Sequence, residues 1–280
     1  MTTLVVCVVL LGALLHASWN AAVKSRTDTF LVTVLVAGGA GLLSAIGLPF
    51  LPTPDAASWP YIAASTVTQL AYYSLLIAAY RNGDMSHAYP LMRGSAPLLV
   101  ALASGPLIGE QLGAVQWLAI GCISGGILAL FFTTRSRHQG AGRTTVFALL
   151  TACMIALFTL IDGAGVRKSG APVAYTMWIF MLTGAGLVAW TAMRRPGKLA
   201  AYARLNMGVV LLGGAANLGS YALALWAMTH APVAAVAALR ETSILFAVGI
   251  AGIVLREKIS AQRLAAIGLV ACGAVAMRLG

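Results

Sequence analysis

The sequence predicts an all-α membrane protein with ten transmembrane helices, arranged as two inverted five-helix repeats. Three observations support this fold class. Of the 280 residues, 60% are hydrophobic and only 9% are charged, whereas soluble domains carry about 45–50% apolar and about 25% charged residues. The apolar residues form runs of about 20, the length that crosses a bilayer as a helix. The second half of the chain also repeats the first. A soluble enzyme, a nucleic-acid-binding domain and a disordered chain are thereby excluded.

Ten apolar runs account for nearly the whole chain, and no gap between them could hold a soluble domain. The first run is followed, not preceded, by the basic residues Lys24 and Arg26, so we expect a mature helix and not a cleaved signal peptide. Later runs stop at breakers such as Pro52-Thr53-Pro54-Asp55 and Arg194-Arg195-Pro196-Gly197. In order, the predicted spans are residues 4–23, 30–51, 59–80, 85–108, 113–133, 144–166, 172–193, 207–229, 233–255 and 261–279. Prolines predict a bend in the fourth span but not in the ninth.

Basic residues concentrate on one side of the predicted membrane. Twelve Lys and Arg residues lie in the gaps after the first, third, fifth, seventh and ninth spans, against only Arg167, Lys168 and Arg278 on the other side. Loops rich in Lys and Arg stay in the cytoplasm. We therefore expect a protein of the bacterial inner membrane with gap 134–143 in the cytoplasm and both termini in the periplasm. The same distribution accounts for the net charge of +11 without a nucleic-acid partner.

The two halves of the sequence align with each other. Residues 88–130 slide onto 235–277 with a shift of 147, and a shift of 148 aligns the third and eighth spans. The matched pairs are Arg93 with Arg240, Glu110 with Glu257, Gly121 with Gly268, Gly126 with Gly273, Gln69 with Asn217, and Tyr73 with Tyr221. Because each half has five spans, the second enters the membrane from the opposite side. We place the repeats at residues 1–138 and 139–280. Inverted repeats are typical of secondary transporters, whose site lies at the repeat interface.

Three stretches carry a resemblance to the drug/metabolite transporter superfamily, and within it to the ten-helix EamA-like transporters. They are His16-Ala-Ser-Trp-Asn-Ala-Ala-Val-Lys24, the Gly109-Glu110 turn before Leu118–Gly126, and Leu255-Arg-Glu-Lys-Ile259 before Gly268. The resemblance implies two EamA-like repeats around a central cavity, lined mainly by helices 1, 3, 4, 6, 8 and 9, with helices 5 and 10 at the periphery. Small four-helix multidrug members couple transport to protons through an acid in the first helix. This first helix has no acid, and Asp162 in the sixth is the nearest equivalent.

Four ionisable residues fall at membrane depth: Arg93, Asp162, Arg240 and Glu241. Each such residue costs about 2.5–3.5 kcal/mol at a helix centre, so each should face protein or water. One interpretation gives them a role in a site or gate, and the other makes them ion pairs that only fasten helices. We expect Glu241 to neutralise Arg93 or Arg240, which leaves the other arginine for an anionic group of a solute.

Polar and aromatic residues share one face of several spans, at helical spacings of three and four. Tyrosine suits a cavity wall because an apolar ring carries a polar tip. His16 is either a buried histidine bonded to a neighbouring helix or a proton-sensitive cavity group. The predicted solute-binding residues are His16, Trp19, Asn20, Gln69, Tyr72, Tyr73, Tyr89, Arg93, Asn217, Tyr221, Arg240 and Glu241.

These patterns predict a secondary active transporter that moves a small organic solute by alternating access. Export of an amino acid or related metabolite is the reading we favour, and a proton-driven multidrug exporter is the alternative. A non-transporting membrane scaffold and an intramembrane enzyme are alternatives of another class. The four cysteines lie in apolar runs, and no catalytic, metal-binding or dinucleotide motif is present, so we expect no enzyme and no cofactor. Expected partners are the solute and membrane lipid, and glycine-rich spans leave a homodimer open.

Overall fold

The computed structural model describes residues 1–24, 26, 28–82, 85–133, 141–254 and 260–279. Over these residues the chain is all helical, and ten helical segments are long and apolar enough to cross a membrane. The predicted fold class is therefore confirmed. The helices of the first half are α1 (Thr3–Lys24), α2 (Thr29–Gly47), α3 (Trp59–Asn82), α4 (Met85–Ile108) and α5 (Ala114–Thr133). Two short 3-10 helices, η1 (Leu48–Phe50) and η2 (Ala56–Ser58), lie between α2 and α3.

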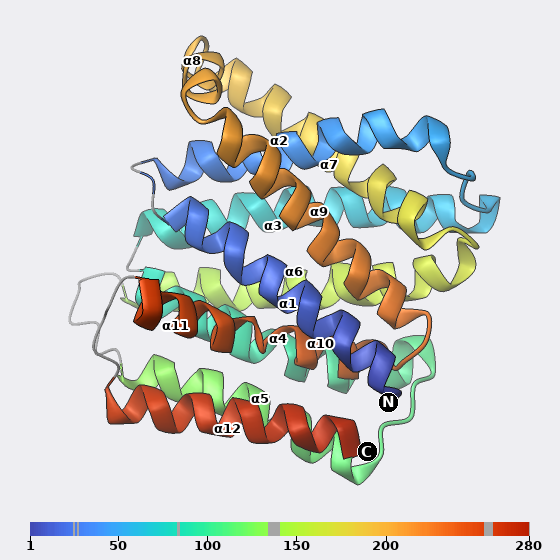
Figure 1. Ribbon diagram of the computed structural model, residues 1–280, viewed down its shortest axis with the longest axis vertical. Helices are drawn as coiled ribbons and strands as arrows, with labels where there is room; N and C mark the ends of the chain where they lie inside the picture. Colours follow the sequence, from blue (N-terminus) through green and yellow to red (C-terminus); the bar gives the residue numbers. More distant parts are fainter. Residues whose placement is uncertain (25, 27, 83–84, 134–140, 255–259, 280) are drawn as a thin grey trace.

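The second half contains α6 (Ala141–Lys168), α7 (Pro172–Arg194), α8 (Lys198–Leu205), α9 (Met207–Met228), α10 (Val233–Arg240), α11 (Ser243–Val254) and α12 (Ala261–Leu279). The short α8 was not predicted, because its eight residues fall in a gap that carries helix breakers at its start. Both termini lie at one end of the bundle, which we call the terminal end (Figure 1). α1 starts at this end and α6 starts at the opposite end, so the two halves run through the bundle in inverted orientation.

The ninth span is not the single helix that the sequence predicts. It breaks between α10 and α11, at Glu241 and Thr242. Here the backbone N–H groups bond three residues back, Glu241 to Ala238 and Thr242 to Leu239, and the Thr242 hydroxyl donates to the Leu239 carbonyl at 2.7 Å. Polar side chains that bond to nearby backbone compete with the regular helix ladder. The prolines of the fourth span, by contrast, lie inside the continuous helix α4.

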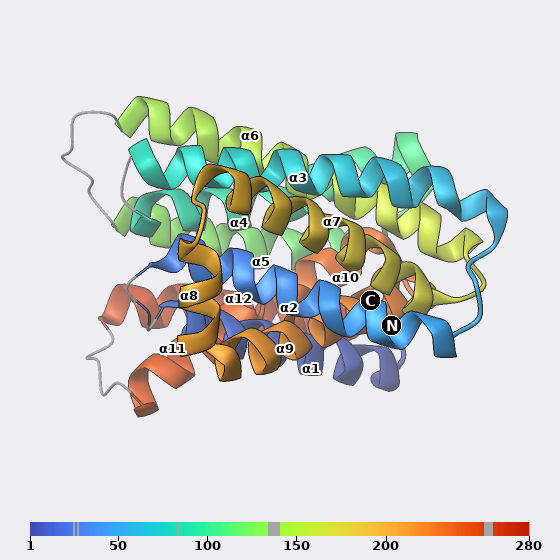
Figure 2. The same ribbon diagram turned by 90° about the horizontal axis from the view of Figure 1, so that it is seen from above.

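The packing of the helices follows the internal repeat. α1 packs on α9 in the same way that α6, its counterpart, packs on α3, and α2 packs on α7. α5 lies along α12 at one edge of the bundle, and the view from above shows the long helices running in one common direction (Figures 1 and 2). These are all contacts between the repeats. The two halves therefore form one interlocked bundle.

Two repeat-related glycines let α5 and α12 approach closely. A Cβ at Gly126 would lie 2.8 Å from the carbonyl oxygen of Ala266, and one at Gly273 would lie 2.8 Å from that of Ala119. The shift of 147 relates both glycines and both alanines, so the same contact occurs twice. Nothing lies within 4 Å of a Cβ added at Gly121. Close packing of α5 on α12 therefore explains the glycines at positions 126 and 273 but not the one at position 121.

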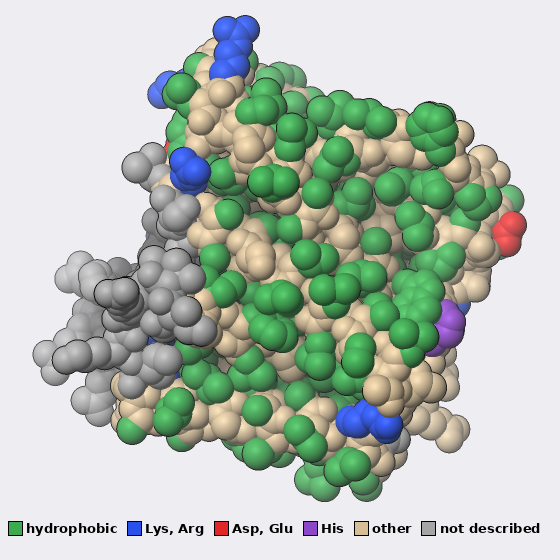
Figure 3. Space-filling view, in the orientation of Figure 1, with side chains coloured by type: hydrophobic (Ala, Val, Ile, Leu, Met, Phe, Trp, Pro, Cys, Tyr) green, Lys and Arg blue, Asp and Glu red, His purple; other side chains and the backbone are tan. Residues whose placement is uncertain are grey.

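The surface fits a protein surrounded by lipid. On the face shown in Figure 3, hydrophobic side chains cover the middle, while Lys and Arg side chains lie toward the ends. Large apolar side chains such as Leu118, Leu212 and Leu264 are more than half exposed. Such a surface would be unfavourable in water and is expected in a bilayer. The chain is a multi-pass membrane protein.

Candidate functional site

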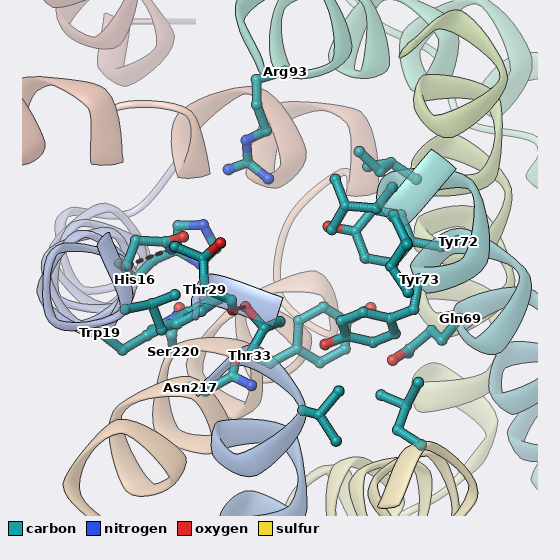
Figure 4. A pocket seen from close by; sticks show the side chains of 18 of the residues that line it. His16, Trp19, Thr29, Thr33, Gln69, Tyr72, Tyr73, Arg93, Asn217 and Ser220 are labelled. Atoms are coloured by element: carbon teal, nitrogen blue, oxygen red, sulfur yellow. Dashed lines mark hydrogen bonds between the residues drawn. The ribbon is translucent and has the colours of Figure 1, made fainter. Parts of the chain in front are cut away.

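A pocket of about 370 Å³ lies inside the bundle, between helices of both repeats (Figure 4). Its walls come from the C-terminal halves of α1 and α3 and the N-terminal halves of α2 and α4, together with α6, α7, α9 and α10. These halves of α1 to α4 all lie toward the end of the bundle opposite the chain termini (Figure 1). The pocket therefore extends from the middle of the bundle toward that end.

The structure brings the predicted solute-binding residues together. All but one of them line this pocket: His16, Trp19, Asn20, Gln69, Tyr72, Tyr73, Tyr89, Arg93, Asn217, Tyr221 and Arg240. The exception is Glu241, which lines a small adjoining cavity of about 30 Å³ together with Arg93 and Arg240. Figure 4 shows Arg93 pointing into the space between His16 and Trp19 of α1 and Tyr72 and Tyr73 of α3.

Two helices that the family resemblance did not emphasise also line the pocket. α2 contributes Thr29, Phe30, Thr33 and Val34, and α7 contributes Phe180 and Leu187. Their sequences carry little signal, because both spans are apolar and the Thr33 hydroxyl is bonded to the carbonyl of Thr29 in its own helix. Ser220 could have been found, since it shares a helix face with Asn217 and Tyr221. No residue of α5 or α12 is among the lining residues.

Aromatic rings form a continuous wall across both repeats. Tyr72 of α3 contacts Tyr73 and Phe158, with centroid separations of 5.0 and 5.7 Å. Tyr221 of α9 lies 6.4 Å from Phe158 and 5.6 Å from Phe180. These separations are typical of packed aromatic pairs. The wall offers a large apolar contact area with hydroxyl groups at its edge.

The polar side chains that α1 and α3 place at the pocket differ in whether they already have hydrogen-bond partners within the protein. The Asn20 amide donates to the carbonyl oxygen of His16 at 2.8 Å, and the Gln69 amide donates to the Ser65 hydroxyl at 3.1 Å. His16 packs edge-on against Trp19 at 5.3 Å. The Trp19 indole N–H is buried and has no hydrogen-bond partner within the described part of the chain. It is a donor available to a bound molecule.

The buried arginines have different partners. Arg93 forms an ion pair with Glu241, with 2.8 Å between Nε and Oε2, and both side chains are largely buried. The expected neutralisation by Glu241 is therefore confirmed, with Arg93 as the partner. Arg240 instead places its guanidinium carbon 4.9 Å from the centre of the Tyr221 ring. Among the residues that the structure describes, no carboxylate lies within ion-pair distance of Arg240.

Asp162 of α6 is fully buried behind the pocket wall. Its carboxylate accepts hydrogen bonds from the Tyr175 hydroxyl at 3.2 Å and the Tyr221 hydroxyl at 2.5 Å, and Ser65 also donates to it. Tyr221 is the direct link between this carboxylate and the pocket.

A second charged cluster joins three elements at the terminal end of the bundle. Glu110, between α4 and α5, accepts from Arg167 at 2.7 Å and from the backbone N–H of Val233, the first residue of α10, also at 2.7 Å. Arg167 in turn donates to the carbonyl oxygens of Met228 and Ala231. A carboxylate at a helix N-terminus is favourable because it meets unpaired N–H groups and the positive end of the dipole. This clamp ties α6, α10 and the α4–α5 turn together beyond the pocket.

Comparison with known proteins agrees with this architecture. The chain matches the EamA-like transporter family over residues 3–132 and 143–279, one match for each half. No curated protein matches it. A solved structure described as "Crystal structure of protein" superposes with a TM-score of 0.79 at 18% identity, covering 100% of this chain and 98% of the other, which supports the fold alone. The two family matches account for nearly all of the sequence, and the chain belongs to the EamA-like transporter family of the drug/metabolite transporter superfamily.

Proposed function

We propose that this protein is a secondary active exporter of a small organic solute that carries a carboxylate and an apolar part, such as an amino acid or related metabolite. The observation that carries the proposal is Arg240, a buried cation without an ion-pair partner in the described chain, on the wall of a pocket shared by both repeats. A pocket of about 370 Å³ holds a molecule of this size, since ligand sites span roughly 300–1,000 Å³.

The chemistry of the walls supports an amphipathic solute. The rings of Tyr72, Phe158 and Tyr221 offer an apolar surface to a side chain or ring. Arg240 offers a charge for a carboxylate, and guanidinium binds carboxylates well because its donors match their geometry. The free indole N–H of Trp19 offers one neutral donor. A polar pocket of this kind also argues against a non-transporting scaffold.

The difference between the two ends of the bundle supports alternating access. The terminal end is held by the clamp between Glu110, Arg167 and the start of α10, while the pocket extends toward the other end. Transport then requires the clamp to open as the pocket closes on its other side. The excess of basic residues in the gaps away from the termini supports a cytoplasmic location for that other end, and solute would then enter the pocket from the cytoplasm of a bacterial cell.

Counterflow in liposomes tests the proposal. Purified protein is reconstituted in liposomes loaded with unlabelled solute, and uptake of the labelled solute is followed for L-amino acids, aromatic carboxylates and lipophilic cations. We expect saturable counterflow of a solute with a carboxylate. Counterflow of lipophilic cations alone would favour the multidrug alternative, and its absence for every solute would contradict a transport function.

A further inference from the structure

Asp162 lies where a carboxylate is energetically costly, and such a position points to a function. It is fully buried in a span, and ionisable groups at membrane depth are rare and mark functional sites. Its hydrogen-bond donors among the described residues are hydroxyl groups, from Ser65 of α3, Tyr175 of α7 and Tyr221 of α9. Hydroxyl groups can donate to a carboxylate and can also accept from a carboxylic acid. This environment can therefore satisfy both the charged and the protonated form of Asp162.

Two routes connect Asp162 to the pocket. Tyr221 donates to Asp162 with its hydroxyl, and the face of its ring meets the Arg240 guanidinium. Ser65 donates to Asp162 and accepts from Gln69, which lines the pocket. A change of charge at Asp162 thus reaches the proposed solute site through side chains in direct contact.

Two arginines and two carboxylates lie at or behind the pocket wall, so their formal charges sum to zero. Arg93 and Glu241 form one neutral ion pair. Arg240 is the positive charge that acts on Asp162, with the Tyr221 ring between them. The other titratable group in contact with Asp162 is Tyr175, on α7. If Asp162 takes up a proton, these four groups carry one net positive charge in a low-dielectric interior, and an anion at Arg240 restores neutrality.

We propose that Asp162 is a proton-binding site whose occupancy is coupled to the binding of an anionic solute at Arg240. This deepens the proposed function and rests on it for the solute. The proton comes from water and binds a carboxylate oxygen of Asp162, which then donates to a neighbouring hydroxyl; it returns to water when the solute leaves. Proton and anion occupy the protein together, so the solute is carried with one proton and without net charge.

The proton site can be tested without any solute. Infrared difference spectra of the full-length protein in detergent, recorded between high and low pH, are expected to show the carbonyl stretch of a buried carboxylic acid. Asp162→Asn should remove this band, while Asp55→Asn, the same change at an exposed aspartate, should leave it. A band that persists in Asp162→Asn, or no such band in the wild type, would overturn the proposal.

The coupling needs a probe, for which 3-phenylpropionate and its neutral amide form a matched pair. The carboxylate stays ionised above about pH 6, because free carboxyl groups titrate near pH 4. Calorimetry of the wild type in buffers of different ionisation heat should show uptake of one proton with the carboxylate and none with the amide. The affinity for the carboxylate should rise as pH falls, by at most about tenfold per pH unit. Asp162→Asn should bind it with no pH dependence.

The outcomes separate the two proposals. Carboxylate binding without proton uptake, or pH dependence that is lost in His16→Gln and retained in Asp162→Asn, would overturn the coupling and leave the solute site standing. Failure of the carboxylate probe to bind, with the infrared band present and assigned to Asp162, would contradict recognition of a carboxylate in this pocket and leave the proton site standing.

Discussion

The ion pair between Arg93 and Glu241 shows how this chain carries charge inside a membrane. The pair joins α4 to the break between α10 and α11, with 2.8 Å between Nε and Oε2. A buried pair contributes little net stability, but removal of one partner is costly because the other charge is left uncompensated. The neighbouring Arg240 points elsewhere, to the ring of Tyr221.

We therefore expect Glu241→Gln to lower the free energy of unfolding by about 3–5 kcal/mol. The double change Arg93→Gln with Glu241→Gln should cost less than the sum of the single changes. The matched cycle of Arg240→Gln with Glu241→Gln should show a smaller interaction energy than the Arg93 cycle, because Glu241 forms its ion pair with Arg93. Thermal unfolding in detergent measures both cycles. Additivity in the Arg93 cycle would remove the ion pair from the account.

Trp19 gives a prediction with opposite effects on stability and binding. Its buried indole N–H has no partner in the described chain, and an unsatisfied buried donor costs about 1–3 kcal/mol. Trp19→Phe removes the donor and keeps an aromatic ring. The solute-free protein should become no less stable, while the affinity for the transported solute should fall by roughly tenfold. Unchanged affinity would show that the indole does not contact solute.

At the scale of the elements, the packing of α5 on α12 depends on glycine at two of four repeat-related positions. Alanine at Gly126 or Gly273 would push a methyl group against the backbone of the facing helix, whereas Gly121 and Gly268 have open space. We expect Gly126→Ala and Gly273→Ala each to destabilise the protein by about 1–3 kcal/mol. Gly121→Ala and Gly268→Ala should be neutral or slightly stabilising, because alanine favours helix. Equal effects at all four positions, measured by thermal unfolding, would contradict this packing.

The sequence predicted the positions of the transmembrane helices better than the breaks within them. Runs of about 20 apolar residues define spans well, because a bilayer demands that length. The break at Glu241 and Thr242 was missed because no proline marks it. Glu241 at this break pairs with Arg93, which is 148 residues away, and a local sequence pattern does not reveal such a contact. In α4, by contrast, three prolines lie inside a continuous helix, so proline alone does not mark where a span is interrupted.

For the pocket, periodicity and the internal repeat brought together residues such as Tyr73 and Tyr221 from different halves. The pocket location of apolar residues such as Phe158 and Phe180 could not be predicted. A phenylalanine in a transmembrane span is equally compatible with facing lipid, the protein core or a pocket. The role of Tyr221 between Asp162 and Arg240 also needed the structure, because it joins three helices.

For the whole molecule, the orientation in the membrane is a prediction from the charge distribution. Gap 134–143 lies largely outside the described residues, so two exposed positions at opposite ends serve instead: Ala200 in α8 and Ala57 in η2 at the terminal end. In a background without the native cysteines, an impermeant maleimide added to intact cells should label Ala57→Cys and spare Ala200→Cys. Labelling of Ala200→Cys alone would show that the orientation is reversed.

The central claim is that Arg240 binds the carboxylate of a solute carried through the pocket. The most direct measurement is solute counterflow in liposomes, comparing the wild type with Arg240→Gln and with Arg278→Gln as a control at the terminal end of the bundle. A hydrogen bond to a charged group contributes about 1.5–3 kcal/mol, so the half-saturating concentration should rise roughly tenfold to a hundredfold in Arg240→Gln. Arg278→Gln should have the same half-saturating concentration as the wild type. Counterflow by Arg240→Gln with the same half-saturating concentration as the wild type would contradict the account.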